Sequence, residues 1–265
     1  MSQPSPVYRF DSAIVRAPSR SVIFGLRALD RGEPTYEGVK AEHDAYVVAL
    51  RAAGVEVTVL PALEEFPDSI FIEDPALVFT EGAVVLRPGA PTRRGEAGAL
   101  APVLCTRFHT VLELPPGGFA DGGDVLVTPE RVLIGRSGRT DNAGARGLVD
   151  CLAKLGRRGG LVETPTEVLH FKTECSLLND ETVLCTARLA RADIFGEFKQ
   201  LIVPPGEEPA ANALRVNDVV MVGHQYSRTI DMLDAAGFDV VPLRTSEIGK
   251  LDAGLSCMSL RWLAP

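Results

Sequence analysis

Several common sequence features are missing from this chain, and each absence excludes a class of protein. No run of about 18 apolar residues occurs, so a membrane span is not expected. The first residues, 1–6, contain neither a basic nor an apolar region, so we expect no secretory signal. Basic residues are in deficit, with 27 Lys and Arg against 35 Asp and Glu. Because nucleic-acid binding needs a basic face, this balance argues against such a partner.

Paired cysteines are absent as well. No CxxC motif occurs, and the five cysteines are scattered: Cys105, Cys151, Cys175, Cys185 and Cys257. An odd, scattered set predicts reduced thiols in a cytoplasmic protein rather than a disulfide framework. Without paired-ligand spacing, we expect no metal centre.

The chain is organised as a repeated local pattern without a low-complexity linker, so residues 1–265 are predicted to form one domain. The pattern is a short strand-forming run, then a polar or basic turn, often followed by a helix. The runs are Ala13–Arg16, Ala83–Arg87, Val132–Arg136, Thr182–Thr186 and Val219–Gly223. Helices are expected at about 38–53, 93–105, 140–156 and 228–236, and further strands at 55–60 and 238–243. This alternation predicts an α/β fold, and five similar units favour radial repetition over a doubly wound sheet.

Cys257 is the best candidate for a nucleophile. It lies between a Gly-containing turn and a terminal hydrophobic stretch, where a basic partner could reach it from elsewhere in the fold. The alternative is a small buried hydrophobe, which is the usual state of a free cysteine. Cys105, Cys151 and Cys185 fit that alternative, because they lie in apolar helical or strand segments.

Two of the four histidines are candidates for the basic partner. His170 follows the strand-like run 167–169, and His224 follows Gly223 at another predicted strand end. Local residue chemistry favours His170 over His224 as the basic partner only slightly. His43 lies on the apolar face of a predicted helix and is expected in the core, whereas His109 is expected in a loop or at a strand edge.

Acidic residues stand in unusual surroundings. Glu73 and Asp74 interrupt an apolar run, and if that run is a strand, at least one carboxylate faces inward. A solvated edge or turn is the more ordinary outcome for such a pair. The segment Asp121-Gly122-Gly123-Asp124 is a turn by its composition. Recognition of a cationic ligand, such as a guanidinium, would explain buried carboxylates at both places.

Two arginines begin predicted helices, where their charge opposes the helix dipole. Arg93 and Arg139 would tolerate that position if each held a carboxylate. An ordinary solvated arginine is the simpler alternative for either one alone.

Together these segments resemble the dimethylarginine dimethylaminohydrolase family of the guanidine-modifying superfamily, which includes arginine deiminase. The segments occur in the family's order: 66–75, 87–96, Asp121–Asp124, Arg139–Thr140, Leu169–Lys172 and the motif around Cys257. The resemblance implies a five-bladed pseudosymmetric α/β propeller of ββαβ repeats, with the site at its central channel. It implies hydrolysis of Nω-methylated arginine to citrulline and a methylamine, without a cofactor.

The resemblance also implies roles for single residues. Cys257 would attack the guanidinium carbon, His170 would protonate the leaving amine and then activate water, and Asp121 would orient His170. The implied substrate contacts are the following: Asp68, Glu73 and Asp74 for the guanidinium or α-amino group, Arg93 and Arg139 for the α-carboxylate, Leu26 in a mobile lid, and Leu251 through its backbone carbonyl.

Other functions remain open from the sequence. An arginine deiminase-like hydrolase or an amidinotransferase would use the same thiol, although relatives of both kinds are longer. A metal-binding module with Cys257, His170 and carboxylates as ligands would belong to a different class. The expected partner is a small guanidine, and the resemblance leaves a homodimer open as the assembly.

Overall fold

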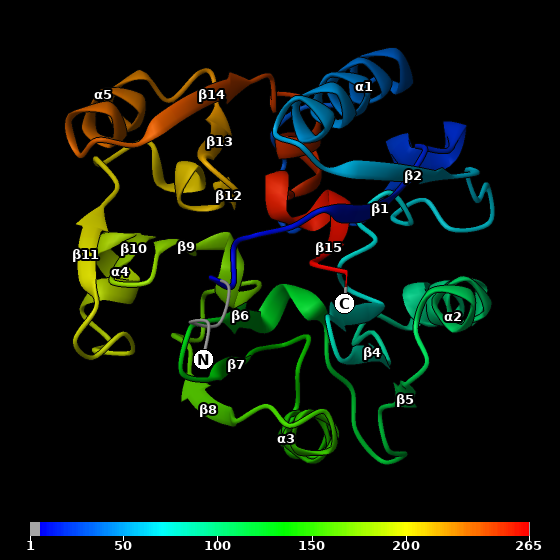
Figure 1. The fold of residues 1–265 in the computed structure, drawn as a ribbon. Helices are drawn as coiled ribbons and strands as arrows, with labels where there is room; N and C mark the ends of the chain where they lie inside the picture. Colours follow the sequence, from blue (N-terminus) through cyan, green and yellow to red (C-terminus); the bar gives the residue numbers. More distant parts are fainter. Residues whose placement is uncertain (1–5, 265) are drawn as a thin grey trace.

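The computed structural model describes residues 6–264 and consists of five three-stranded sheets arranged in a ring (Figure 1). Each sheet repeats one plan. Its middle strand pairs antiparallel with one neighbour and parallel with the other, and in all five units the parallel neighbour follows the middle strand through a helix. The predicted five-bladed α/β propeller of ββαβ repeats is therefore confirmed.

The middle strand of each sheet lies between its antiparallel neighbour and its parallel neighbour. In that spatial order the sheets are β15–β1–β2 (Ser259–Trp262, Ser12–Arg16, Glu56–Leu60), β3–β4–β5 (Ala76–Phe79, Gly82–Val85, Val111–Glu113), β6–β7–β8 (Val125–Val127, Val132–Arg136, Gly159–Glu163), β9–β10–β11 (Cys175–Asn179, Thr182–Cys185, Lys199–Ile202) and β12–β13–β14 (Leu214–Val216, Val219–Gly223, Asp239–Leu243). The five runs that the sequence singled out are the five middle strands. These strands are buried on both faces, so their apolar residues are continuous rather than alternating.

The connecting helices follow the predicted positions closely, with one addition. They are α1 (Tyr36–Ala52), α2 (Arg94–Arg107), α3 (Asn142–Lys154), α4 (Ala187–Ala190) and α5 (Ser227–Ala235). The sequence did not predict α4, because a four-residue helix is too short to show a period. Short 3₁₀ helices occupy several loops: η1 (Arg20–Phe24), η2 (Pro91–Arg93), η3 (Gly122–Asp124), η4 (Phe171–Thr173), η5 (Glu208–Ala211), η6 (Ile248–Leu251) and η7 (Leu255–Met258).

The two ends of the chain complete the first sheet together. β1, near the N-terminus, pairs antiparallel with β15, near the C-terminus, with Ser12 opposite Trp262. Behind this sheet, α1 buries Val39, Tyr46 and Leu50 completely. The Tyr46 hydroxyl also lies 2.5 Å from Oγ of Ser259, so the buried polar group is paired. The closing strand is therefore held by backbone pairing, apolar packing and a side-chain hydrogen bond.

The helices and the cysteines bear on two further expectations. No helix in residues 6–264 is long and apolar enough to cross a membrane. Cys151, Cys175 and Cys185 are buried, but Cys105 is exposed on α2, so its predicted place in the core was wrong. Position 105 lies on the outward face of α2, whose buried face is formed by Ala97, Leu100 and Leu104.

Candidate active site

The candidate site lies where the chain enters the innermost strands of the ring. β9 contacts both β6 and β12, and β15 contacts β3. The antiparallel neighbours of the middle strands, β3, β6, β9, β12 and β15, therefore face the centre of the ring and are called the inner strands. Four predicted residues lie two to five positions before the start of such a strand: Asp74 two before β3, Asp121 four before β6, His170 five before β9 and Cys257 two before β15. The ring therefore brings side chains from four units together, although they are far apart in the sequence.

Glu73 and Asp74 lie in a series of turns and not in a strand, so the strand interpretation of this run was wrong. Both residues are 4% exposed. Asp74 accepts a hydrogen bond from the backbone N–H of Gly123 at 3.0 Å and forms an ion pair with Arg93. Turns place both carboxylates inside the protein, where each requires donors to offset lost hydration.

Asp121 and His170 form the best-defined contact of the site. Nε2 of His170 lies 2.9 Å from Oδ2 of Asp121, and the backbone N–H of Gly89 donates to Oδ1 at 2.8 Å. Asp121 is completely buried. The expected strand end before His170 was wrong, because residues 166–170 form a turn and bend that lead into η4.

Asp124 holds the backbone beside Asp121 and His170 in place, a role that the sequence did not indicate. One of its oxygens accepts from the backbone N–H of Phe171 at 2.8 Å, and the other accepts from the hydroxyls of Ser137 and Thr140, each at 2.6 Å. Thr140 Oγ1 in turn accepts from the backbone N–H of Asp121 at 3.1 Å. Asp124 thus fixes the backbone beside both members of the pair. The only sequence signal was its place as the second aspartate of the Asp-Gly-Gly-Asp segment.

The carboxylates change the charge state of His170. Burial alone would lower its pKa, but the charge of Asp74, the hydrogen bond that His170 donates to Asp121, and the charge of Asp124 together raise the pKa of His170 to about 9. Burial alone would raise the pKa of Asp74, but Arg93 and His170 outweigh it and lower that pKa. The site at neutral pH therefore holds an imidazolium among carboxylates.

Cys257 lies in η7, immediately before β15. Its backbone carbonyl accepts from the N–H of Glu73 at 3.2 Å, which joins the cysteine to the turn that carries Asp74. Burial, followed by the charges of Glu73 and Asp74, raises the pKa of the Cys257 thiol. The free site therefore holds a neutral thiol, and further positive charge close to the sulfur would favour the thiolate.

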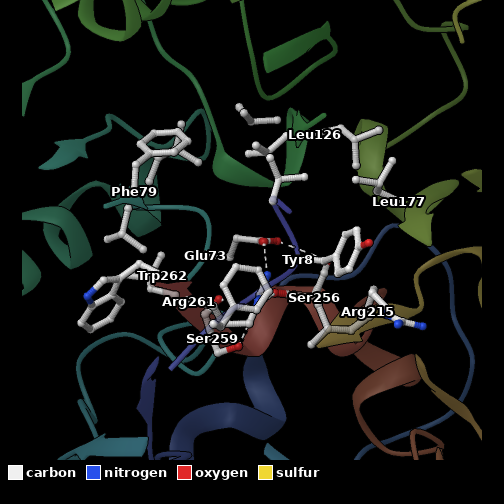
Figure 2. A pocket seen from close by; sticks show the side chains of 18 of the residues that line it. Tyr8, Glu73, Phe79, Leu126, Leu177, Arg215, Ser256, Ser259, Arg261 and Trp262 are labelled. Atoms are coloured by element: carbon white, nitrogen blue, oxygen red, sulfur yellow. Dashed lines mark hydrogen bonds and ion pairs between the residues drawn. The ribbon is translucent and has the colours of Figure 1, made fainter. Parts of the chain in front are cut away.

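Glu73 faces a different space from its neighbour Asp74. Its carboxylate accepts from Lys172 Nζ at 2.5 Å, Arg261 Nη2 at 3.2 Å and Ser256 Oγ at 3.3 Å. These four residues line a cavity of about 430 Å³, with Glu73, Ser256 and Arg261 meeting at one side (Figure 2). Asp74, Asp121, His170 and Cys257 do not line this cavity. Glu73 thus belongs to the same series of turns as Asp74, but it lines the cavity and Asp74 does not.

The predicted contacts at Leu26, Asp68 and Leu251 lie around Gly25. Asp68 accepts a hydrogen bond from the backbone N–H of Leu26 at 2.9 Å. A Cβ atom at Gly25 would lie 3.0 Å from the Asp68 carboxylate and 3.1 Å from Leu251, so the three elements pack closely. Burial raises the pKa of Asp68. The loop containing Leu26 is thereby attached to a carboxylate of the predicted site.

The two predicted arginines differ in their surroundings. Arg93 is buried, and its guanidinium donates to Glu96, to Asp74 and to the carbonyls of Asp68 and Phe71. The Arg139 guanidinium, by contrast, makes no hydrogen bond or ion pair to the residues that the structure describes. Only Arg139 is free to accept a ligand carboxylate without breaking existing contacts.

The other histidines lie outside this cluster. His43 is buried in α1 among apolar residues, as predicted, and burial lowers its pKa to about 4. His224 is exposed and lies 3.0 Å from the side-chain oxygen of its neighbour Gln225, and His109 is exposed in a bend. His170 is therefore the histidine that carboxylates surround, which the sequence favoured only slightly over His224.

Three groups of the site could also approach a metal ion. One ligand atom from each of Asp74, Asp121 and His170 lies within 4.8 Å of the others. Arg93 already occupies Asp74, and the hydrogen bond between Asp121 and His170 uses one atom of each. A metal ion at this position would compete with these partners for the same atoms.

Sequence comparison identifies known proteins that are similar to this chain. A family model described as "N,N dimethylarginine dimethylhydrolase, eukaryotic" matches residues 29–151. The N(G),N(G)-dimethylarginine dimethylaminohydrolase of Pseudomonas aeruginosa is 36% identical, over 96% of this chain and 100% of its own length. The protein of the same name from Streptomyces coelicolor is 32% identical, over 94% of this chain and 96% of its own.

Solved structures agree with the sequence matches. The P. aeruginosa enzyme, crystallised as a cysteine-to-serine mutant with citrulline, superposes with a TM-score of 0.93 at 35% identity, covering 96% of this chain and 100% of its own. A histidine-to-glycine form described as an adduct with S-methyl-L-thiocitrulline gives a TM-score of 0.92. The N-terminal domain of ArgZ, at 20% identity and a TM-score of 0.83, shares the fold.

Proposed function

Because the chain belongs to the dimethylarginine dimethylaminohydrolase family, we propose that it hydrolyses Nω-methylated L-arginine to L-citrulline and a methylamine. One observation carries this proposal. Four units of the ring supply a thiol, an imidazolium and two buried carboxylates from the segments that enter their inner strands. A thiol beside paired carboxylates is suited to attack on a carbon that carries positive charge.

Binding of the substrate would activate the nucleophile. The guanidinium is a cation, and Asp74 is a buried carboxylate next to the segment that holds Cys257. A cation bound there offsets the charges that raise the pKa of the Cys257 thiol, and so lowers that pKa. The thiol therefore releases its proton to solvent once substrate is bound, and the cysteine of the free enzyme stays in the less reactive neutral form.

The covalent reaction then has two halves. Sγ of Cys257 attacks the guanidinium carbon, and the bond from that carbon to the methylated nitrogen breaks as His170 gives that nitrogen a proton. A water molecule, deprotonated by His170, then adds to the same carbon. The C–S bond breaks and the cysteine leaves as a thiolate, while the added hydroxyl loses its proton to solvent to form the carbonyl of citrulline; the thiolate then takes up a proton from solvent. Splitting displacement from hydrolysis in this way lowers each barrier.

His170 has one nitrogen available for these proton transfers. Nε2 is engaged by Asp121, whereas Nδ1 makes no hydrogen bond to any residue the structure describes. Asp121 itself is held by Gly89. We assign Asp121 the role of fixing the ring and stabilising the imidazolium, by the same logic that a carboxylate serves a histidine in hydrolase triads.

Substrate recognition would use groups around the cluster. We propose that Arg139 binds the α-carboxylate, and that Asp68, together with the backbone carbonyl of Leu251 and the loop at Leu26, encloses the amino-acid end. Arg93 contributes its charge to the same region while it holds Asp74. Glu73 remains a candidate for the guanidinium, although it already accepts from three protein donors.

The decisive test is citrulline formation from asymmetric dimethylarginine, monomethylarginine and arginine, without added metal. Cys257→Ser serves as the control because the exchange is nearly isosteric. We expect turnover of the methylated substrates that disappears in the variant. Turnover of arginine alone would indicate a deiminase instead. Full activity of Cys257→Ser would overturn the mechanism.

A further inference from the structure

The fifth unit of the ring also sends a polar side chain toward the site. Asn212 lies immediately after η5 and two positions before β12, a place comparable to that of Asp74, Asp121, His170 and Cys257, which lie two to five positions before the inner strands of their own units. It is 7% exposed. Nothing in the sequence pattern singled it out, because its neighbours, Ala210, Ala211 and Ala213, are apolar and suggest an ordinary core segment.

Both ends of the Asn212 amide contact the nucleophile segment. Oδ1 accepts from the backbone N–H of Ser256 at 3.3 Å, and Nδ2 lies 3.6 Å from Sγ of Cys257. The backbone N–H of Ser256 is a donor, so it must face the amide oxygen. The orientation of the amide is therefore determined, and its NH₂ group points at the sulfur.

Asn212 also packs against the turn that precedes the cysteine. A Cβ atom at Gly254 would lie 2.3 to 2.7 Å from Cβ, Cγ and Nδ2 of Asn212, so any side chain at position 254 would displace Asn212 or the turn. The carbonyl of Gly254 accepts from the N–H of Cys257 at 3.3 Å. The amide thus touches the nucleophile turn at Gly254, Ser256 and Cys257, so a shift of Asn212 would move the thiol.

The charges around the sulfur give the amide a further task. Glu73 and Asp74 are the carboxylates near Cys257, and both oppose a negative charge on it. The N–H of Asn212 acts in the opposite direction, because a donor binds a thiolate more strongly than a thiol.

We propose that Asn212 is a positioning residue for Cys257, whose amide holds the nucleophile turn with its oxygen and donates a hydrogen bond to the thiolate with its nitrogen. The inference rests on the proposed function, because it takes Cys257 as the nucleophile. It adds a contribution from the fifth unit to those of the other four.

The test is the rate of Cys257 alkylation by iodoacetamide from pH 6 to 10, measured by mass spectrometry of the peptide that contains Cys257. Peptide resolution is needed because Cys105 is exposed. Asn212→Ala removes the donor, and Asn212→Asp keeps the shape while exchanging the NH₂ group for an acceptor. We expect the Cys257 titration to move to higher pH in both, with alkylation at pH 8 lower by about threefold to tenfold in the alanine variant. The aspartate variant should lose more.

A matched control is Asn217→Ala, which removes another amide of the same unit. Asn217 donates to the carbonyls of Phe10 and Ala53 and accepts from the N–H of Phe10, away from the sulfur. It should leave the Cys257 titration unchanged. The proposal is overturned if the titrations of both Asn212 variants match that of the unaltered protein. Should Asn212→Ala fail to fold, the nearly isosteric aspartate variant decides alone. The readout does not need turnover, so its result is separable from a failure to find citrulline.

Discussion

Asp121 and His170 are joined by a 2.9 Å hydrogen bond although 49 residues separate them in the sequence. Each comes from a different unit of the ring, and each is fixed by Asp124, which binds the backbone N–H after His170 and the hydroxyl of Thr140 that accepts from Asp121. One buried aspartate thus sets the geometry of the acid–base pair.

Asp121→Asn should keep this contact but remove the charge. The substitution takes away a group that raises the pKa of His170, so the imidazolium becomes less stable. We expect kcat to fall by about 10²-fold or more, the usual scale for loss of general acid–base catalysis. A pH profile of kcat for the methylated substrate tests this, and the alkaline limb should move to lower pH. Asp141→Asn, at the start of α3, is the control; equal losses in both variants would contradict the assignment.

The charge on His170 should make stability depend on pH. The pKa of His170 is raised from 6.5 to about 9 in the folded protein, so protonation stabilises the fold fully below pH 6.5. This contribution, about 3 kcal/mol at most, is lost as the pH rises through about 9. Urea unfolding at pH 6, 7.5 and 9 should show it as a shrinking difference between Cys257→Ser and Cys257→Ser/His170→Gln. The serine background removes the titration of the thiol, and a difference independent of pH would refute the raised pKa.

The loop that carries Leu26 should loosen when Asp252 is removed. Oδ2 of Asp252 accepts from the backbone N–H groups of Ala28 and Leu29, at 2.5 and 3.3 Å. We expect Asp252→Ala to raise KM about threefold to thirtyfold, since it removes two hydrogen bonds to a charged group. Asp252→Asn should raise KM less, because asparagine keeps a side-chain oxygen that can accept these hydrogen bonds. Asparagine also tolerates the positive φ of 55° at this position. Steady-state kinetics will decide, and equal KM values in all three proteins would exclude the loop contact as a determinant of binding.

Arg139→Ala should weaken binding only of substrates that carry an α-carboxylate. Its guanidinium has no partner among residues 6–264, so we expect the fold to be unaffected and KM to rise about tenfold to a hundredfold, as for the loss of a charged hydrogen bond. A decarboxylated analogue should bind both proteins equally. An equal loss with that analogue would contradict the role.

Arg93→Ala is the contrasting variant. Removing this buried guanidinium leaves Asp74 and Glu96 without their cation, so unfolding should become easier by about 3–5 kcal/mol. Urea unfolding separates the two arginines, because Arg139→Ala should not change the midpoint.

The outline of the fold could be predicted because each unit repeats a local pattern. The five buried runs that became middle strands are apolar apart from their ends, and the apolar residues of α1, α3 and α5 show helical spacing, whereas those of α2 show little. Predictions failed where tertiary contacts outweigh local preference. The run around Glu73 looks like a strand, yet Arg93, Lys172 and Arg261 hold its carboxylates in a series of turns. Similarly, the segment before His170 is a turn in which the N–H of Val168 donates to the carbonyl of Pro165, and Asp124 holds the backbone that follows His170.

The residues around Asp74, Asp121, His170 and Cys257 suggested a thiol enzyme for a guanidinium, and the resemblance of their ordered motifs to a known family made that prediction specific. Only the closed ring decided which of their groups meet. Pairing of β15 with β1 brings the end of the chain back to its beginning, and the inner strands then direct their preceding segments to one centre. Asn212 shows most clearly what the sequence alone does not indicate. An amide among alanines carries no sequence signal, and its contact with Cys257 arises from packing between distant units of the ring.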